Sequence, residues 1–512
     1  MKYLSEKMNV LFIITDQQRA DHLSCAGNPD LKTPNIDRFA SESLRFTNAY
    51  CANPMCMPNR STIFTGKYPS IHGVRCNGIN LDPKIPTFPQ SLLNSGYHTS
   101  SFGKIHLNWY GTPWSRKYFS YEMVIPFIYT PKEKRKPLPK SYYGLKEVKL
   151  TCGHGDAVSG DYLDWIEERA PEYLELTKSR ATKLFDQILS ESPLPKDLHQ
   201  TSFITEETIS FLERYSNGAY GDKPFFVHCS FPDPHHPVCP PENYQKMYDP
   251  DKIEVSRTLN EINKLYEHEV LKNHVNVYPR TRLRKTNEEE LRKFQAYTYG
   301  VISLIDHGIG RILAALNSLG LEKDTIVIFT SDHADLMGDH GMLLKGPAHF
   351  QGLIKVPFIW KVPGITKAGT ITNSLVSSID IPSTILNLLG IEEKLHPHGM
   401  QGIDITPILR DSSIKLRDHC IIEEDEDAHK TTKKNLFQNI RVRTMVTEDY
   451  RLTIYQGWQG LGDLFDLKND PNEQNNLWNN PNYREIRDNL VYKMFHEILN
   501  LQDRYPKKQA QA

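Results

Sequence analysis

A cysteine and an arginine four residues apart mark the segment of this sequence that is best suited to form a nucleophile. Cys56 opens residues 56–60 (CMPNR), whose proline can lie in the first turn of a helix, and Gly66 follows at a position suited to end that helix. A thiol at a helix N-terminus lies near the positive end of the backbone dipole, and the Arg60 guanidinium would further favour its ionisation. Free cysteine is also commonly a small buried apolar side chain, so this segment alone leaves both interpretations open.

Two apolar runs end in polar side chains that are suited to bind a metal ion. One run ends at Asp16 and Gln17, and another ends just before Asp332 and His333. Both runs are typical of buried parallel strands, and ligands bind at the carboxyl edge of such a sheet. We therefore expect these side chains to meet at one edge, although a helix cap is the alternative to a metal ligand for Asp16.

Basic side chains follow two other runs of the same kind. Lys104 and His106 lie at the end of a strand-like run, and their i, i+2 spacing puts both side chains on one face of an extended segment. His235 and His236 lie in a proline-bounded loop after a further run. Because adjacent side chains of an extended chain point apart, we expect one functional histidine here rather than a pair that binds a metal together.

Two further polar side chains lie in loops beside glycine. Lys345 precedes Gly346, and a lysine in a loop is usually solvated. Asn77 precedes Gly78, where it could contact a substrate oxyanion or cap a turn. The residues alone leave a structural role open for both.

The elements that must position these side chains alternate between strand and helix along the chain. Strand-like and helical patterns occupy residues 9–15, 33–40, 87–96, 99–106, 202–215, 224–231, 294–319, 324–330 and 356–360. This order predicts an α/β fold with a large mixed, mostly parallel sheet flanked by helices. We expect it to form a catalytic domain over residues 1–410, with an insertion at about 109–198 that covers the site and carries specificity.

The pattern changes after residue 410. Residues 411–512 are predicted to form a smaller α+β subdomain with an antiparallel sheet and a terminal helix. The acidic run 423–427 in this part is expected to be a solvated loop.

Composition excludes several classes of partner. The chain has 512 residues and a formal net charge of −1, so no global field attracts nucleic acid or an anionic membrane. Its 8 cysteines are scattered without a CxxC pair, which makes reduced thiols the default. No apolar run of membrane-spanning length and no apolar signal core is expected, so we predict a cytoplasmic protein. A trimmed exported form would look the same, and the oligomeric state is not fixed by the sequence.

As a set, these motifs resemble the sulfatase family of the alkaline phosphatase superfamily, including its phosphonate monoester hydrolase branch. The motifs that carry the resemblance are Cys-x-Pro-x-Arg at 56–60, Gly-Lys-x-His at 103–106, Pro-His-x-Pro at 234–237, Ser-Asp-His at 331–333 and Lys-Gly at 345–346. Residues 463–467 and 470–473 look like the C-terminal subdomain of the family. The resemblance therefore covers most of the chain and implies an alkaline-phosphatase-like fold.

The resemblance also implies two cofactors. A maturation enzyme would oxidise Cys56 to formylglycine, whose hydrate offers one hydroxyl as nucleophile and a second whose deprotonation expels sulfate. Asp16, Gln17, Asp332 and His333 match the ligands of one divalent metal, which the oxygen of modified Cys56 would also contact. An oxygen-rich set favours Ca²⁺, and the imidazole makes Mn²⁺ the alternative.

Catalytic and substrate-binding roles follow from the same resemblance. Arg60 and Lys104 would position the formylglycine, and His106 would be the base that releases sulfate. The leaving oxygen and the sulfuryl group would face His235 and Lys345, as general acid and electrostatic clamp. Asn77 is the weaker candidate for contact with a substrate oxygen.

The implied reaction is hydrolysis of a small-molecule or saccharide O-sulfate ester. Gln17 resembles the phosphonate monoester hydrolases, whereas Lys104 and His106 resemble the sulfatases. A phosphonate monoester or phosphodiester hydrolase with the same machinery is therefore the alternative, and a non-catalytic binding protein on this fold is a third interpretation. Met57 and Asn59 replace the small residues usual in the cysteine motif.

Overall fold

A mixed sheet forms the centre of the protein in a computed structural model that describes residues 8–111, 119–184, 187–261, 270–271, 283–426, 440–457 and 460–502. Nine strands form this sheet, in the order β12, β2, β11, β9, β1, β7, β4, β5 and β6. Their bounds are, in the same order, Thr370–Thr372, Leu44–Phe46, Phe358–Lys361, Thr325–Ser331, Asn9–Thr15, Phe225–Ser230, His98–Gly103, Glu147–His154 and Ala157–Gly160. The five strands from β9 to β5 are parallel to their neighbours, and β11 and β6 pair antiparallel to theirs. The predicted fold class is confirmed.

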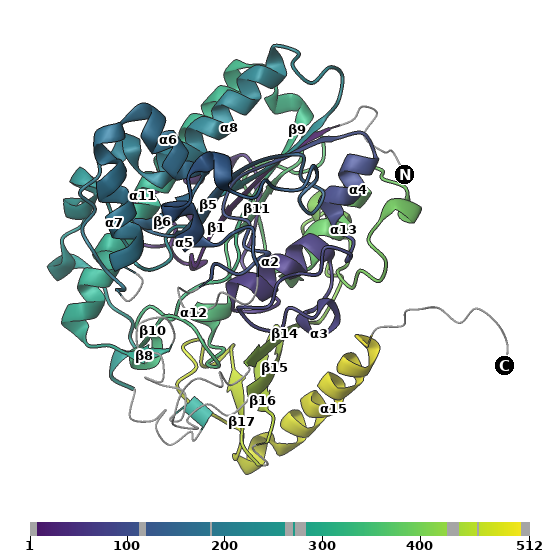
Figure 1. The fold of residues 1–512 in the computed structure, drawn as a ribbon. Coiled ribbons are helices and arrows are strands. Elements are labelled where there is room, and N and C mark those ends of the chain that lie inside the picture. Colours follow the sequence, from purple (N-terminus) through teal and green to yellow (C-terminus); the bar gives the residue numbers. More distant parts are fainter. Residues whose placement is uncertain are drawn as a thin grey trace.

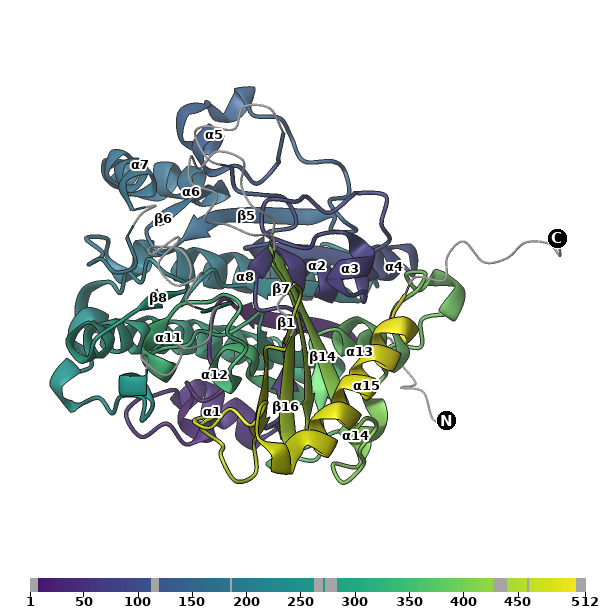
Figure 2. The same ribbon diagram turned by 90° about the horizontal axis from the view of Figure 1, so that it is seen from below.

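Strand β1 shows how the sequence builds this sheet. All seven of its residues are buried, as expected for a strand covered by helices on both faces. Alternate side chains enter different cores, because Val10 and Phe12 join one apolar cluster while Leu11 and Ile13 join the other. Figures 1 and 2 show the helices on both faces of the sheet.

The helices divide between these two cores. Side chains of α1, α8 and α11 pack into the cluster of Leu11, and those of α2, α4 and α13 pack into the cluster of Val10. The bounds of the longer helices are Pro34–Ser41 (α1), Cys56–Thr65 (α2), Phe88–Asn94 (α4), Asp161–Arg169 (α6), Leu174–Lys183 (α7), Gln200–Ser216 (α8), Glu288–Ser318 (α11), Asp380–Leu388 (α13) and Arg484–Asn500 (α15). Shorter helices are α3 (Pro69–His72), α5 (Val124–Tyr129), α12 (Gln351–Ile354) and α14 (Thr406–Arg410).

Helix α11 departs from the expectation that no apolar run reaches membrane-spanning length. It is long and apolar enough to cross a membrane, with a mean hydropathy of 1.3 in its most apolar window. However, 72% of that window is buried inside the protein, as in a core helix. We therefore assign α11 to the covering layer of the sheet.

Residues 109–198, which are predicted to cover the site, contribute two strands to the main sheet. Strand β5 pairs in parallel with β4, and β6 returns antiparallel to β5. This segment therefore delivers side chains to the same sheet edge as the other strands. The predicted boundaries at 410 and 411 stay a prediction.

The C-terminal part contains the expected antiparallel sheet. Its strands run in the order β14 (His419–Glu426), β15 (Ile440–Thr447), β16 (Tyr450–Tyr455) and β17 (Gly462–Asp466), and α15 packs against them (Figure 1). Two further two-stranded sheets pair β10 (Met342–Leu343) with β8 (Arg284–Lys285) and β13 (Val376–Ser377) with β3 (Ala49–Tyr50).

The acidic run is not a solvated loop, so this prediction was wrong. Residues 423–426 belong to β14 and are buried, while Asp427 lies outside the described residues. Their charges are met by groups from elsewhere in the chain: Arg443 donates to Asp425 at 2.7 Å, and a His349 nitrogen lies 2.8 Å from Glu424. Buried carboxylates need such partners, and these partners come from distant positions.

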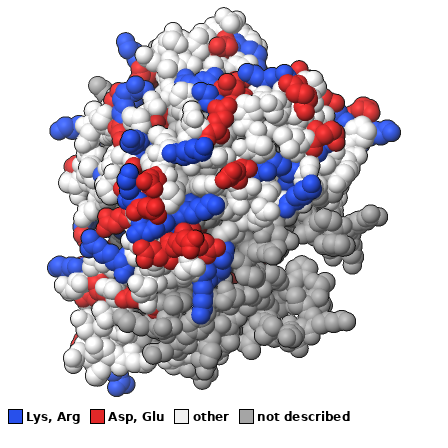
Figure 3. All heavy atoms as spheres, turned by 90° about the vertical axis from the view of Figure 1, so that its left-hand side faces the viewer, with Lys and Arg blue, Asp and Glu red and all other residues white. Residues whose placement is uncertain are grey.

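The surface charge agrees with the small net charge. Figure 3 shows one face of the molecule, on which lysine and arginine side chains are interspersed with aspartate and glutamate. No large area of one sign stands out on the described part of this face.

Candidate active site

The carboxyl ends of β1 and β9 bring two aspartates together. The strands are parallel with Thr15 opposite Ser331, so Asp16 and Asp332 are the next residues on neighbouring strands. Both carboxylates are fully buried. The expectation that these side chains meet at one edge of the sheet is confirmed.

Cys56 and His333 complete a compact cluster with these aspartates. One donor atom from each of Asp16, Cys56, Asp332 and His333 lies within 4.8 Å of every other. The Nε2 atom of His333 is 3.1 Å from the Cys56 Sγ atom and 3.5 Å from an Asp16 oxygen. His333 Nδ1 contacts the carbonyl of Ala334 at 2.9 Å, which places the ring proton on Nδ1 and leaves the Nε2 lone pair facing the cluster.

Cys56 is the first residue of α2, as predicted. All ten residues of this helix are buried, and Gly66 ends it with φ 68°, a conformation suited to glycine. Burial and Asp16 raise the pKa of the Cys56 thiol, but Lys104, Lys345 and His333 outweigh them, so that its pKa is lowered. The thiol is therefore activated mainly by lysines rather than by Arg60.

Arg60 braces the two carboxylates instead. Its Nε donates to Asp332 at 2.7 Å, and a terminal nitrogen lies 3.5 Å from Asp16. Another terminal nitrogen donates to Ser230 at 2.9 Å. Burial raises the pKa of Asp16, but Lys104 and Arg60 outweigh it and hold that pKa well below its usual range.

Asn59 and Met57, which replace the small residues usual in the cysteine motif, both take part in hydrogen bonds. Asn59 donates to the backbone carbonyl of Asp332 and accepts from Ser378 at 2.8 Å. The backbone N–H of Met57 donates to the side-chain oxygen of Asn77 at 3.1 Å. The structure thus places Asn77 as a cap of α2, which is the second of its two predicted roles.

Lys345 is buried at the centre of the cluster rather than solvated. Its Nζ atom lies 3.0 Å from Cys56 Sγ, 2.8 Å from His235 Nε2 and 3.1 Å from His333 Nε2. An ammonium group has three N–H donors, and these three contacts can use all of them. Lys345 therefore joins the cysteine to the histidine loop.

Lys104 and His106 reach the site by a different route from the one predicted. Strand β4 ends at Gly103, where a Cβ atom would lie 1.9 Å from the Ser230 carbonyl oxygen, and His106 has φ 58°. The two side chains therefore do not alternate along a strand. Lys104 still donates to Asp16, and the His106 ring stacks on Tyr110 with centroids 3.8 Å apart.

Two site histidines were missed or misjudged from the sequence. His154 ends β5, and its Nε2 atom is 2.8 Å from Lys104 Nζ. The rings of His235 and His236 do not point apart but stack at 4.1 Å, because their loop is not an extended strand. The rule used for Asp16 does not mark His154, because its strand β5 mixes charged, polar and apolar residues rather than forming an apolar run.

The imidazoles around the lysines are held neutral. Burial lowers the pKa of His106, His154 and His235 well below the usual range, and Lys104 lowers each of them further. The Nδ1 atom of His106 is buried and has no hydrogen-bond partner among the residues that the structure describes. A neutral imidazole with a free nitrogen can accept a proton.

The donor set fits a hard divalent cation. Gln17, with φ 63°, donates from Nε2 to Asp335 at 2.6 Å, whereas its Oε1 is buried without a partner in the described part of the chain. Buried polar atoms are nearly always satisfied, so an orphaned oxygen beside two carboxylates and an imidazole is consistent with a cation site.

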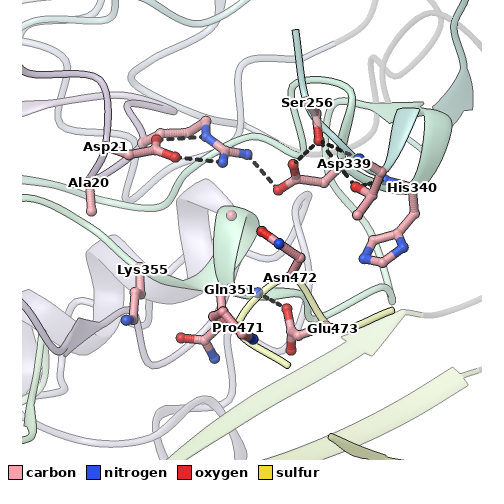
Figure 4. Close-up of a pocket in the computed structure, with 13 residues that line it drawn as sticks. Ala20, Asp21, Ser256, Asp339, His340, Gln351, Lys355, Pro471, Asn472 and Glu473 are labelled. Atoms are coloured by element: carbon pink, nitrogen blue, oxygen red, sulfur yellow. Dashed lines mark hydrogen bonds and ion pairs between the residues drawn. The ribbon is translucent and has the colours of Figure 1, made fainter. Parts of the chain in front are cut away.

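A polar cavity of about 280 Å³ is lined by residues of the loops that follow β1 and β9 and of the C-terminal part, and none of the metal-ligand candidates is among its lining residues (Figure 4). Arg19 lies in its wall and donates to Asp339 at 2.8 Å, to Asp21 at 2.7 Å and to the carbonyls of Asp335 and Leu336. Arg19 follows β1 and Asp339 follows β9, so the pair ties together the two loops that carry the metal-ligand candidates.

Replacing Arg19 by methionine is expected to lower the free energy of unfolding by about 3–5 kcal/mol, because it leaves the Asp339 carboxylate without its ion-pair partner and removes the Arg19 donor from the Asp335 carbonyl. Chemical denaturation followed by circular dichroism measures this loss. Asp21→Asn is the matched control, since the Asp21 side chain is 58% exposed and its pairing should contribute at most about 1 kcal/mol. Equal losses in the two variants would contradict the bracing role of Arg19.

Comparisons with known proteins agree with this geometry. Residues 8–391 match the family model described as Sulfatase, and residues 338–500 match that of the C-terminal part of N-sulphoglucosamine sulphohydrolase. An arylsulfatase of Clostridium perfringens is 28% identical, over 98% of this chain and 96% of its own. A ulvan-active sulfatase of Formosa agariphila is 27% identical, over 98% and 82%. The phosphonate monoester hydrolase structure of Agrobacterium radiobacter superposes with a TM-score of 0.78 at 26% identity, covering 98% of this chain and 97% of that one.

Proposed function

The chain belongs to the sulfatase family of sulfuric ester hydrolases, and we propose that it cleaves an O-sulfate ester with a formylglycine made from Cys56. The observation that carries the proposal is the convergence of Cys56 with Asp16, Asp332 and His333, and with Lys345 at 3.0 Å from its sulfur. The sulfur atom here stands in for the oxygen of the hydrated aldehyde. The Cys56 sulfur is buried, lies beside the metal-ligand candidates, and is in contact with the Lys345 ammonium group.

Members of this family generally use a divalent metal. Asp16, Asp332, His333 and the unpartnered oxygen of Gln17 would hold it here. When bound, such a cation supplies Lewis acidity to the anionic ester. The mainly oxygen donor set supports Ca²⁺, and His333 keeps Mn²⁺ as the alternative.

The surrounding residues position the reacting groups and transfer the proton. Formylglycine hydrate supplies one hydroxyl for attack on sulfur and a second for expulsion of sulfate. Arg60 fixes Asp332 and Asp16 in place, and with Lys104 it outweighs burial and holds the pKa of Asp16 well below its usual range. His106, with its buried free Nδ1, accepts the proton of the second hydroxyl.

Lys345 and His235 act on the leaving oxygen. Their 2.8 Å contact places an ammonium donor and an imidazole side by side at the cysteine. The ammonium balances the developing negative charge, and the pair supplies the proton to the departing alcohol. The substrate is a sulfated small molecule or saccharide.

A phosphonate monoester or phosphodiester hydrolase is the second candidate. Two observations favour it: the TM-score of 0.78 to a phosphonate monoester hydrolase, and Gln17 at a metal-ligand position. The same side chains would stabilise a phosphorus centre in the same way.

The deciding experiment compares esters with one leaving group. We expect protein co-expressed with a formylglycine-generating enzyme to hydrolyse 4-nitrophenyl sulfate faster than the matching phosphonate and phosphodiester. Peptide mass spectrometry across Cys56 measures the modified fraction, and protein from a host without that enzyme is the control. A sulfate rate far below the phosphonate rate would select the second candidate. If the fully modified protein hydrolyses none of these esters, the result would select the third interpretation, a non-catalytic binding protein.

A further inference from the structure

His154 links the two lysines of the site. Lys104 Nζ is 2.8 Å from His154 Nε2, and Lys345 Nζ is 2.8 Å from His235 Nε2. The rings of His154 and His235 stack with centroids 3.7 Å apart and 15° between their planes. The four side chains therefore form two lysine–imidazole pairs joined by one ring stack.

This arrangement lies at the nucleophile. One nitrogen of His154 and one of His235 lie, with Cys56 Sγ, within 4.8 Å of one another. His154 is also the most open of the imidazoles here, with 18% of its side chain exposed, whereas His235 is 5% exposed. It therefore lies at the more solvent-exposed side of the cluster.

The hydrogen bond fixes the tautomer of His154. An ammonium group has donors and no acceptor, so Lys104 must donate to Nε2. The proton of the neutral ring is then on Nδ1. The side chain consequently orients Lys104 through one nitrogen while its ring face supports His235.

Loss of either contact has a definite consequence. Without an acceptor at His154, Lys104 would keep its ion pair with Asp16, which is a metal-ligand candidate, and its position over the Tyr110 ring. Without the His154 ring, His235 would keep its stack on His236 and its contact with the His236 carbonyl but would lose the support on its other face, so its alignment with Lys345 would loosen. A misplacement of about 1 Å in a catalytic group can cost about 10²-fold in rate.

We propose that His154 is a positioning residue that holds Lys104 by a hydrogen bond and His235 by ring stacking, so that the leaving alcohol is protonated at a fixed place. This inference rests on the proposed function, because it assigns the proton to the Lys345–His235 pair. The segment that carries His154, residues 109–198, thereby contributes a residue to the catalytic arrangement.

Two substitutions separate the two contacts. His154→Gln keeps an amide oxygen for Lys104 but removes the ring, so we expect kcat to fall about 10²-fold on an alkyl sulfate and within about 3-fold on 4-nitrophenyl sulfate. His154→Phe keeps a ring but removes the acceptor, so we expect similar losses on both esters. The KM values should change little, because the substitutions disturb protonation and alignment rather than binding.

The measurements are kcat and KM for a series of sulfate esters with different leaving-group pKa values. Modification of Cys56, measured by mass spectrometry, normalises the rates, and thermal unfolding checks the fold. Lys149→Ala, an exposed change on the same strand, is the control and should match the unsubstituted protein. Identical profiles for the two His154 variants, effects on KM alone, or alkyl sulfate rates within about 3-fold of the control would overturn the inference.

The two proposals fail in distinguishable ways. If the unsubstituted protein hydrolyses phosphonate esters instead of sulfate esters, the proposed function fails and the same leaving-group series on phosphonates tests His154. If the unsubstituted protein cleaves sulfate esters and the variants behave like the control, only the role of His154 fails. If neither ester class is cleaved by modified protein, both fail.

Discussion

Replacing Cys56 by alanine is expected to lower kcat/KM for a sulfate ester by about 10⁵–10⁶-fold, as loss of a catalytic nucleophile does elsewhere. Alanine has no sulfur to oxidise, so formylglycine cannot form. Cys56 lies at the start of a buried helix and its side chain contributes little packing volume, so the loss of stability should be about 1 kcal/mol. Steady-state kinetics and thermal unfolding on the same preparation measure the two effects.

Cys51→Ala is the matched control for this change. Cys51 is also buried, but burial and Asp332 raise the pKa of its thiol well above the ordinary value, and the backbone hydrogen bonds at Cys51 and Asn53 do not offset them. We expect its substitution to leave kcat unchanged. Activity retained in Cys56→Ala, or lost equally in Cys51→Ala, would contradict the mechanism. Resistance of the mature enzyme to iodoacetamide would further separate it from a cysteine hydrolase, in which the thiol itself attacks.

The metal-ligand candidates could be predicted from the sequence because their placement depends on local rules. An apolar run that ends in a carboxylate indicates a buried strand and its carboxyl end. Parallel strands then bring such ends together, as Thr15 opposite Ser331 brings Asp16 beside Asp332. Neither step requires knowledge of which strands are neighbours in space.

His154 could not be placed in this way. Its strand β5 lies in a segment of proline, tyrosine and charged residues, and it becomes part of the main sheet only by pairing with β4. The hydrogen bond to Lys104 follows from that pairing. A residue that is functional through a long-range partner therefore looks in the sequence like any polar loop residue.

The buried acidic strand illustrates the same limit for charge. Residues 423–426 look solvated because each carboxylate is costly to bury alone. In the structure Glu423 accepts from Ser70, and His349 lies 2.8 Å from Glu424. Local charge density thus predicts exposure only when no distant partner compensates it, and these partners lie more than 70 positions away.

Lys345→Ala is the second substitution with a large expected effect. Its Nζ atom contacts Cys56, His235 and His333, so its loss removes a preorganised cation from the place where charge develops on the leaving oxygen. Removal of one such donor typically costs about 10²–10³-fold in kcat. We expect a loss of this size, larger for alkyl than for aryl sulfates, because the alkyl leaving group depends more on protonation.

The half-buried Lys355 provides a control for this substitution. It lies in the cavity of Figure 4, contacts Asn48 at 3.0 Å, and has its pKa lowered by burial. Lys355→Ala should affect stability rather than kcat, since this side chain has no described contact with the cluster. Methylammonium can enter the space vacated in Lys345→Ala and replace the ammonium donor, so partial rescue of kcat by this amine in that variant alone is expected. A Lys345→Ala enzyme with normal kcat for both ester types would show that the clamp on the leaving oxygen is supplied by another group.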